Sequence, residues 1–236
     1  MRILKRILTS VLFWFIGNTI ALCAILVAKF YLGVFTGPVG SDVFDVTFNL
    51  LSGGLISFLF YFLVVYVPER RRAKILKNNV ISIYQRCRED IVTSVVMASV
   101  QGGRKDLSTM WSDIKELAEV EQFKAAFSGG RLGNEGFYAF ENQMNDRTYE
   151  FDRIIQDFKI LAAELSFFLH NYSQADAIHF ISLKRLELSL LSLIDSQPGY
   201  DESKPFCSFL YRFLAGFDPI DGHLGRDVYL DALRKI

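Results

Sequence analysis

The chain has 236 residues, 51% of them hydrophobic, and its 26 basic side chains balance 26 acidic ones. This composition is too apolar for a disordered chain. The charge is unevenly distributed, because residues 1–77 carry nine Lys and Arg against three Asp and Glu, whereas residues 78–236 have a net charge of −6. Binding to a phosphate backbone requires clustered cations, so we expect no direct nucleic-acid binding.

Two uncharged apolar segments, residues 7–28 and 46–67, dominate the N-terminal part of the chain. As a helix, each would span about 33 Å, which is enough to cross the ~30 Å hydrocarbon layer of a bilayer. Because a segment in lipid must satisfy its own backbone polar groups, we predict a transmembrane hairpin within residues 1–70. A cleaved signal peptide is the alternative for the first segment. The apolar run continues past Cys23 and Ala24, however, so we interpret it as an uncleaved anchor.

Basic residues precede the first apolar segment and follow the second, and none lies in the connection at residues 33–45. The positive-inside rule therefore predicts that both termini lie in the cytoplasm. The residues expected near the inner leaflet are Arg2, Lys5, Arg6, Arg70, Arg71, Arg72, Lys74 and Lys77. Membrane lipid is an expected partner of these side chains, at about 1 kcal/mol each, although topology determination alone explains the same charges.

Small residues recur at helical spacing in both predicted spans and allow membrane helices to approach closely. They are Gly17, Ala21, Ala24 and Ala28 in the first span, and Gly53 and Ser57 in the second. Two interpretations remain open: packing within one hairpin, or packing between copies in a homo-oligomer. Asn18 and Asn49 place an amide in each span, and an amide in lipid favours a hydrogen-bonding partner. Neither span contains an ionisable group that would indicate a proton relay.

Residues 71–236 are predicted to form a cytoplasmic all-α domain, a bundle without strand alternation. We expect Pro68 to end the second span or to begin a new helix. The predicted helices cover residues 72–101, 107–127, 137–172, 173–196, 204–215 and 225–235, with a capping box of Ser173 and Asp176 and a turn at residues 218–222.

Two of these helices carry broad apolar seams, which are typical of a bundle core. The first seam comprises Phe151, Ile154, Ile155, Phe158, Leu161, Ala162, Leu165, Phe168 and Leu169. The second comprises His179, Leu183, Leu186, Leu190 and Leu193. We expect the two seams to close against each other.

No pattern of catalytic or metal-ligating residues stands out, and we predict a protein that is not an enzyme and uses no cofactor. Asp176 and His179 have the spacing of half a di-iron site, but a second copy of the motif is absent, so a structural role is favoured. The roles of His170 and His223 stay open. The glycine-rich loop at residues 128–136 lacks the Lys-Ser/Thr of a phosphate-binding loop. Cys23, Cys87 and Cys207 form no CxxC pair and are expected to be reduced thiols.

A two-span hairpin followed by a helical cytoplasmic domain resembles the two-transmembrane effectors of bacterial anti-phage systems, including those encoded with retrons. The resemblance rests on the layout of the whole chain. It implies an effector of the bacterial inner membrane that partner proteins hold inactive and that perturbs the membrane when released. The alternative function is a membrane-anchored adaptor or sensor whose hairpin only tethers it. A membrane enzyme using His170 and His179 is a third, less favoured interpretation.

Overall fold

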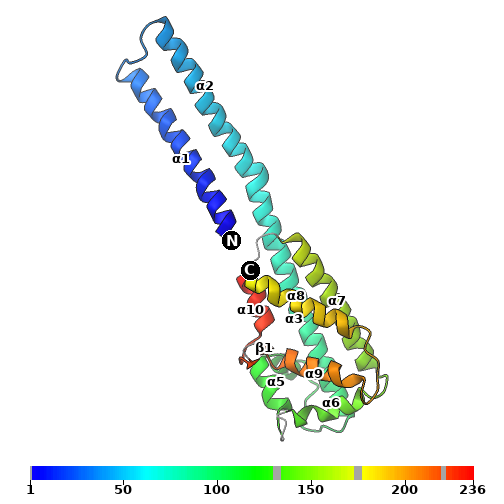
Figure 1. Cartoon of the computed structure of the whole chain (residues 1–236). Coiled ribbons are helices and arrows are strands. Elements are labelled where there is room, and N and C mark those ends of the chain that lie inside the picture. The colour runs from blue at the N-terminus through cyan, green and yellow to red at the C-terminus, as the bar shows by residue number, and fades with distance from the viewer. Residues whose placement is uncertain (1, 130–133, 173–176, 219–221) are drawn as a thin grey trace. The chain divides into compact units, whose positions relative to one another are not determined.

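The computed structural model describes residues 2–129, 134–172, 177–218 and 222–236, and for residues 2–12 and 218 it describes the backbone only. The chain divides into two compact units, Met1–Ile75 and Leu76–Ile236. Helices dominate both units, and the described strands are two residues long each, so the predicted all-α class is confirmed (Figure 1).

In the first unit, α1 (Arg2–Phe30) packs against α2 (Pro38–Tyr61) as a hairpin. Both helices are long and apolar enough to cross a membrane, and their apolar windows are not buried by the rest of the protein. The Phe15 and Phe58 rings stack with centroids 4.3 Å apart. Near the connection, the Lys29 ammonium lies 3.5 Å from the ring centroid of Phe44, a buried residue of α2. Aromatic contacts therefore hold both ends of the described hairpin seam.

Pro68 is the second residue of an α-helix, so of the two outcomes predicted for it, the beginning of a new helix is the one observed. A π-helical turn, η1 (Phe62–Tyr66), leads directly into α3 (Val67–Gln101). The Val67 N–H bonds to the Phe62 carbonyl, five residues earlier. In an α-helix, a proline lacks the N–H for its hydrogen bond and clashes with the carbonyl four residues before it. In a π turn the hydrogen bonds join residues five apart, so the carbonyl groups before Pro68 are paired differently. The proline is accommodated inside a helix instead of terminating it.

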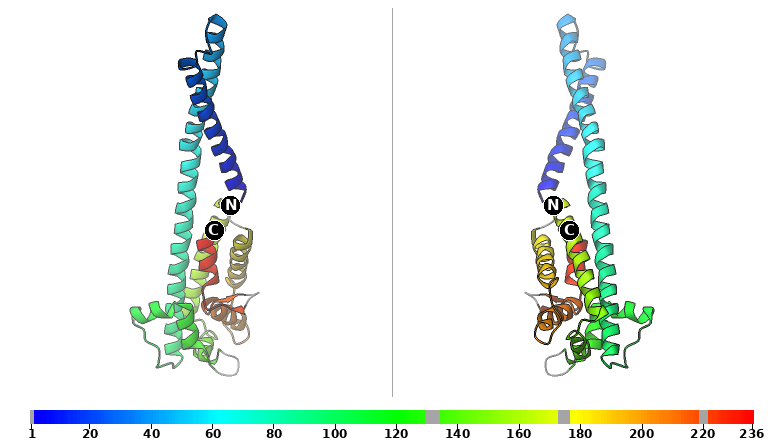
Figure 2. Two further views of the ribbon diagram at one scale, coloured as in Figure 1. Left: turned by 90° about the vertical axis from the view of Figure 1, so that its left-hand side faces the viewer. Right: turned by 90° about the vertical axis from the view of Figure 1, so that its right-hand side faces the viewer.

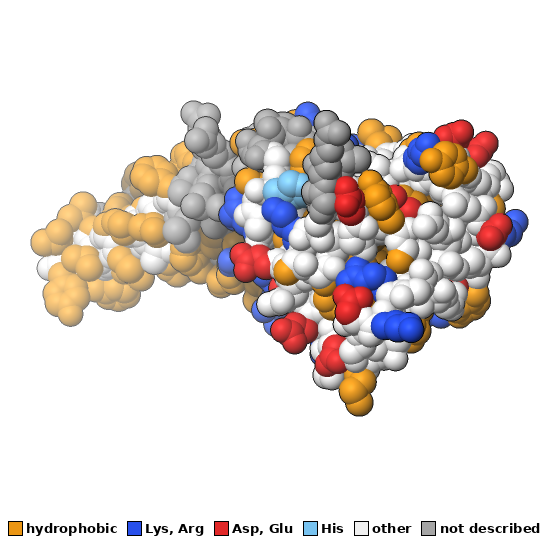
Figure 3. Space-filling view, turned by 90° about the horizontal axis from the view of Figure 1, so that it is seen from below, with side chains coloured by type: hydrophobic (Ala, Val, Ile, Leu, Met, Phe, Trp, Pro, Cys, Tyr) orange, Lys and Arg blue, Asp and Glu red, His pale blue; other side chains and the backbone are white. Residues whose placement is uncertain are grey.

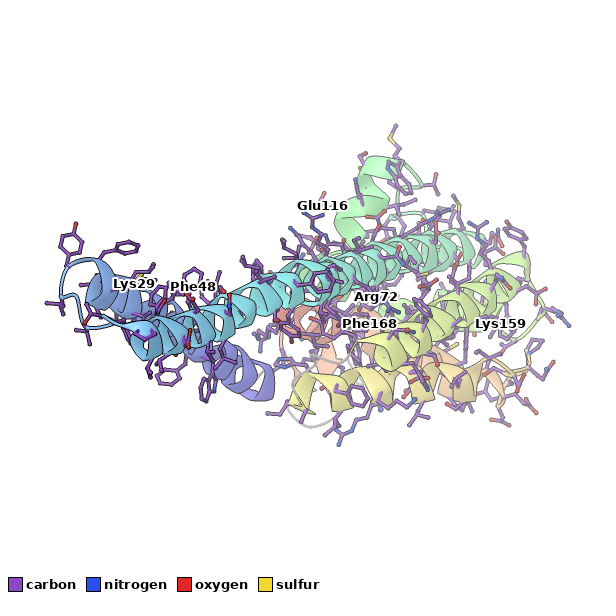
Figure 4. All side chains as sticks on the ribbon, turned by 90° about the horizontal axis from the view of Figure 1, so that it is seen from above. Lys29, Phe48, Arg72, Glu116, Lys159 and Phe168 are labelled. Carbon is purple, nitrogen blue, oxygen red and sulfur yellow. The ribbon has the colours of Figure 1, made fainter. Side chains whose placement is uncertain are left out.

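The second unit is built around α3, which is buried over much of its circumference. Helix α7 (Tyr149–Asn171) packs on α8 (Ala177–Leu193), and α8 packs on α10 (Val228–Lys235), as Figures 1 and 2 show. All nine predicted seam residues of α7 and the four leucines of the α8 seam are buried, and His179 is half-buried. Figure 4 labels one buried and one exposed side chain of α7, Phe168 and Lys159. The prediction that the two seams close on each other is confirmed.

Aromatic rings fill the space between the shorter helices. The Phe123 and Phe127 rings of α5 (Val120–Phe127) have centroids 4.6 Å apart. Phe137 in η2 (Glu135–Phe137) lies 5.5 Å, centroid to centroid, from Tyr211 in α9 (Ser203–Leu214). Phe206, also in α9, contacts the Phe158 ring at 5.7 Å. Helix α9 thus joins the aromatic cluster of α5 and η2 to the α7 seam.

The predicted helix at 107–127 is wrong as one element. The structure has α4 (Trp111–Leu117) and α5, with an extended Glu119 between them. Arg88 on α3 donates from Nε to the Ala118 carbonyl at 2.8 Å. A continuous helix would use that carbonyl for its own ladder, so a long-range hydrogen bond stabilises the break.

The predicted helix at 137–172 is also wrong as one element. It divides into η2, α6 (Tyr138–Gln143) and α7. The Thr148 hydroxyl accepts a bond from the Phe151 N–H at 3.1 Å and so begins α7 as an N-cap. The proposed capping pair Ser173 and Asp176 lies outside the described residues.

The turn predicted at residues 218–222 is flanked by a minimal antiparallel pair of strands, β1 (Phe217–Asp218) and β2 (Gly222–His223). Phe217 is paired with His223, and the remaining turn residues are outside the described part of the chain. Helix α10 then begins at Asp227, whose carboxylate accepts from the N–H groups of Tyr229 and Leu230.

Candidate functional site

The seam of the hairpin includes a polar contact that requires a glycine. The Asn18 amide of α1 lies against Gly54 of α2, and a methyl group at Gly54 would collide with Asn18 Nδ2. Asn18 Oδ1 is buried and has no hydrogen-bond partner among the described atoms. Gly54, which the sequence analysis did not single out, therefore lies in the seam of the hairpin beside Asn18.

The predicted small residues lie largely outside this seam. Gly17, Ala24, Gly53 and Ser57 are exposed, and Ala21 and Ala28 are partly exposed. A methyl group at Gly17 or Gly53 would meet no atom within 4 Å. Gly53 stands nine residues after Phe44, about two and a half helical turns, which places it opposite a residue of the seam. The structure thus separates the seam, which contains Gly54, from a surface that contains Gly53.

Asn49, Gly53 and Ser57 recur every four residues and form one exposed side of α2, here called the Asn49 face. The Asn49 side chain makes no described hydrogen bond, and its exposure places the amide on the outside of the hairpin. An amide and two small residues in this arrangement are suited to close contact with another helix. A second small surface, with Gly17 and Ala24, lies on α1.

The predicted inner-leaflet cations do not all have free side chains. Arg70, Arg71, Arg72 and Lys74 are exposed, and Arg70 donates to the Tyr66 hydroxyl at 3.3 Å. Lys77 donates from Nζ to the Arg234 carbonyl at 2.7 Å, in the last turn of α10. Carbonyls at a helix C-terminus lack intrahelical donors, so Lys77 supplies one. The side chains of Arg2, Lys5 and Arg6 lie outside the described part of the structure.

A buried polar network joins α3 to the start of α10. The Arg88 guanidinium, 5% exposed at the residue level, lies 3.3 Å from the Asp227 carboxylate and donates to the Phe213 and Leu214 carbonyls. The Tyr84 hydroxyl donates to the same carboxylate at 2.8 Å. Burial, followed by the negative charge of Asp227, raises the pKa of Tyr84 well above its ordinary value. This network is missing from the sequence analysis, since no local pattern marks a buried arginine.

A hollow of about 530 Å³ adjoins this network between α3, the α4–α5 junction and α10. Its lining includes five carboxylates besides Asp227: Glu89, Glu116, Glu119, Glu121 and Asp231. Figure 4 labels Glu116, which is exposed on α4. The cations at the edge are Arg226 and Arg234, and Arg226 pairs with Asp231 at 3.5 Å. Negative charge therefore predominates in this hollow, here called the acidic groove.

Figure 3 shows one face of the molecule, on which acidic and basic side chains are interspersed. The three histidines contribute to separate places: His170 contacts the Ser166 carbonyl, His223 contacts the Ala215 carbonyl, and His179 lies on α8. Within the described residues, no group of three or more His, Cys, Asp or Glu side chains is positioned to hold a metal ion. The partner of His179 in the proposed half-site, Asp176, falls outside those residues.

The three cysteines form no disulfide in the structure: Cys23 is exposed on α1, and Cys87 and Cys207 are buried. Burial raises the pKa of Cys87 to about 12 and that of Cys207 further, which keeps both thiols protonated at neutral pH.

No protein-family model matches the chain, and comparisons with curated proteins and with solved structures found no similar protein.

Proposed function

We propose that the chain is an effector of the bacterial inner membrane whose hairpin self-associates through the Asn49 face and perturbs the membrane. One observation carries the proposal: Asn49, Gly53 and Ser57 lie together on the side of α2 that does not contact α1. A hairpin that only tethered a soluble domain would need no amide on its lipid-facing side.

The physical reason for association is the cost of an unpaired amide in hydrocarbon. A hydrogen bond between membrane helices contributes only ~0.6 kcal/mol on average, so the Asn49 amide alone would hold copies together weakly. Gly53 and Ser57 add close backbone approach along the same helix face, and van der Waals packing is the main attraction available in lipid. In this assembly the Asn49 amide fixes the register between the helices of two copies, and the small residues Gly53 and Ser57 provide the close packing.

The second small surface, on α1, favours an assembly larger than a dimer. Gly17 and Ala24 are exposed on a different helix from the Asn49 face. If one surface of a copy contacts the other surface of its neighbour, the contact is heterologous, and such contacts form a ring when the rotation between copies closes. A ring of hairpins is a structure that perturbs a membrane.

The helical unit is proposed to lie in the cytoplasm and to bind the partner proteins that control the effector. The acidic groove supports a partner with basic side chains, because opposite charge steers association and suppresses wrong partners. The cations that flank the apolar segments in the sequence support the orientation with both termini inside.

Expression in bacteria of the intact chain and of residues 80–236 tests the proposal. We expect loss of membrane potential, measured with a potential-sensitive dye, from the intact chain alone. Gly53→Leu should abolish both depolarisation and crosslinking between copies, whereas Phe30→Leu, at an exposed apolar position of α1 away from Gly17 and Ala24, should leave both unchanged. Abundance and membrane insertion of each variant are measured first.

The second candidate function is that of a membrane-anchored adaptor. An adaptor needs only a surface on which a partner protein docks, and the acidic groove is such a surface. An intact chain that never depolarises cells, even without partners, would establish this alternative over the effector. Depolarisation that persists in a well-inserted Gly53→Leu variant would show that the Asn49 face is not the assembly surface.

A further inference from the structure

Asp157 is a buried carboxylate on α7, a helix that lies beside α3 (Figures 1 and 2). The residue is 5% exposed, and its Oδ2 atom has no hydrogen-bond partner among the described atoms. Burial penalises a negative charge, so buried carboxylates are normally paired with a cation or fully hydrogen-bonded. Asp157 has neither form of compensation at Oδ2, and nothing in the proposed function uses it.

The charged groups that act on Asp157 come from α3 and from α7 itself. Across the helix interface, Asp90 on α3 repels the negative charge of Asp157. Arg153 on α7 and Arg86 on α3 attract it. The Arg86 side chain is 84% exposed and lies 3.8 Å from Asp90, while Arg153 is exposed and donates to the Tyr149 hydroxyl. Water screens both cations, so they compensate a buried charge poorly.

The remaining titratable neighbour is the thiol of Cys87 on α3. Burial first, then Asp157 and Asp90, raise the pKa of this thiol to about 12, so it stays neutral. Burial and then Asp90 raise the pKa of Asp157 from its ordinary value near 3.8 to about 6. At neutral pH the contact thus contains two carboxylates and one neutral thiol, and the other charged neighbours are Arg86, Arg153 and, beside the thiol, Glu164.

We propose that Asp157 and Asp90 form a pH-sensitive contact between α3 and α7, in which neutral Asp157 allows tight packing and ionised Asp157 loosens it. A neutral Asp157 removes the repulsion with Asp90 and carries an O–H donor in place of one negative charge. The inference goes beyond the proposed function, because it makes the packing of the helical unit respond to acidification of its surroundings.

The direction of the pH dependence follows from proton linkage. The folded chain holds the Asp157 proton more tightly than the unfolded chain, so between about pH 4 and about pH 6 it binds more protons. Its stability therefore falls as the pH rises through this window, and the full penalty is present above about pH 6. Each unit of difference between the folded and unfolded pKa changes the folding equilibrium constant by a factor of ten. The shift of Asp157 from 3.8 to about 6 therefore corresponds to a change of up to about a hundredfold.

The test compares intact wild-type chain with Asp157→Asn in detergent micelles, by thermal unfolding at about pH 7.5 and about pH 5. We expect the Asn variant to unfold at a higher temperature than the wild type at the higher pH and close to the wild type at the lower one. The matched control is Asp152→Asn on the same helix, where the carboxylate is 51% exposed and pairs with Arg147. The proposal would be overturned if Asp157→Asn did not raise the unfolding temperature at the higher pH, or raised it equally at both pH values.

Hydrogen exchange separates looser packing from a general change in stability. At about pH 7.5, peptides from α7 should exchange more slowly in Asp157→Asn than in the wild type, while peptides from α1 should be unchanged. Asp90→Asn should act in the same direction, because it removes the repulsion from the other side. Identical α7 exchange in wild type and Asp157→Asn would contradict the proposed loosening.

Discussion

The Arg88 guanidinium lies 3.3 Å from the carboxylate of Asp227, and this pair joins the middle of α3 to the first residue of the C-terminal helical segment. The same guanidinium donates to backbone carbonyls at the α4–α5 junction and at the end of α9. One buried side chain therefore connects four elements that are distant in the sequence.

Replacing this arginine by a neutral side chain should destabilise the helical unit strongly. Arg88→Met leaves the partly buried Asp227 charge without its cation and three carbonyls without the Arg88 donor, which we expect to cost ~3–5 kcal/mol in the free energy of unfolding. Denaturant unfolding of the intact chain, followed by circular dichroism, measures the loss. The control Arg226→Met removes an exposed ion pair and should change stability by less than ~1 kcal/mol. Equal effects of the two substitutions would contradict the role of Arg88.

The core of the α7 seam gives a second stability prediction. Phe158 is fully buried and contacts Phe206 and Phe209, so Phe158→Ala should cost ~3–5 kcal/mol through the cavity it leaves. Phe167 on the same helix is 53% exposed, and Phe167→Ala should have a much smaller effect. Thermal melts of the two variants in parallel make the comparison. A Phe158→Ala chain that melts within a degree of the wild type would remove this residue from the core.

Adjacent glycines of α2 should respond in opposite ways to the same substitution. A methyl group at Gly54 would meet the Asn18 amide, so Gly54→Ala should displace this side chain and loosen the seam, whereas Gly53→Ala meets nothing within the same chain. The measurement is disulfide formation between Phe15→Cys and Phe58→Cys, introduced at the stacked rings in a chain whose native cysteines are replaced by serine. Crosslinking should fall with Gly54→Ala and persist with Gly53→Ala. Equal crosslinking in both would mean that Gly54 does not set the distance between the helices.

Membrane topology is predicted to place both termini in the cytoplasm. The expected result follows from the basic residues that precede the first apolar segment and follow the second, and from their absence in the connection at residues 33–45. Reporter fusions at Ser41 and Ile236 measure it, with an external signal expected at the first position and a cytoplasmic signal at the second. A cytoplasmic signal at Ser41 would refute the predicted hairpin orientation.

Much of the fold could be predicted from local patterns. The seams Phe151–Leu169 and Leu183–Leu193 were identified from their spacing, because a helix that packs on another must place apolar residues every three or four positions. The breaks in the predicted helices at 107–127 and 137–172 were not identified. The first is stabilised by a hydrogen bond from Arg88, thirty residues earlier, which no local pattern reveals.

The candidate site was predictable in composition but not in placement. Small residues and an amide in each span were evident in the sequence, yet helical spacing alone left open whether they face the other span or the outside. The π turn before Pro68 escaped prediction for a related reason, because the sequence shows a residue that disrupts the α-helical ladder but not how the backbone adjusts.

The sequence by itself determined the two apolar segments, the all-α class and the seams, because charge and hydrophobic periodicity are properties of neighbouring residues. Only the tertiary structure decided which glycine lies in the hairpin seam, that Arg88 pairs with Asp227, and that Asp157 is buried opposite Asp90. These features depend on burial and on partners from other helices. A side chain acquires such partners only when the chain has folded.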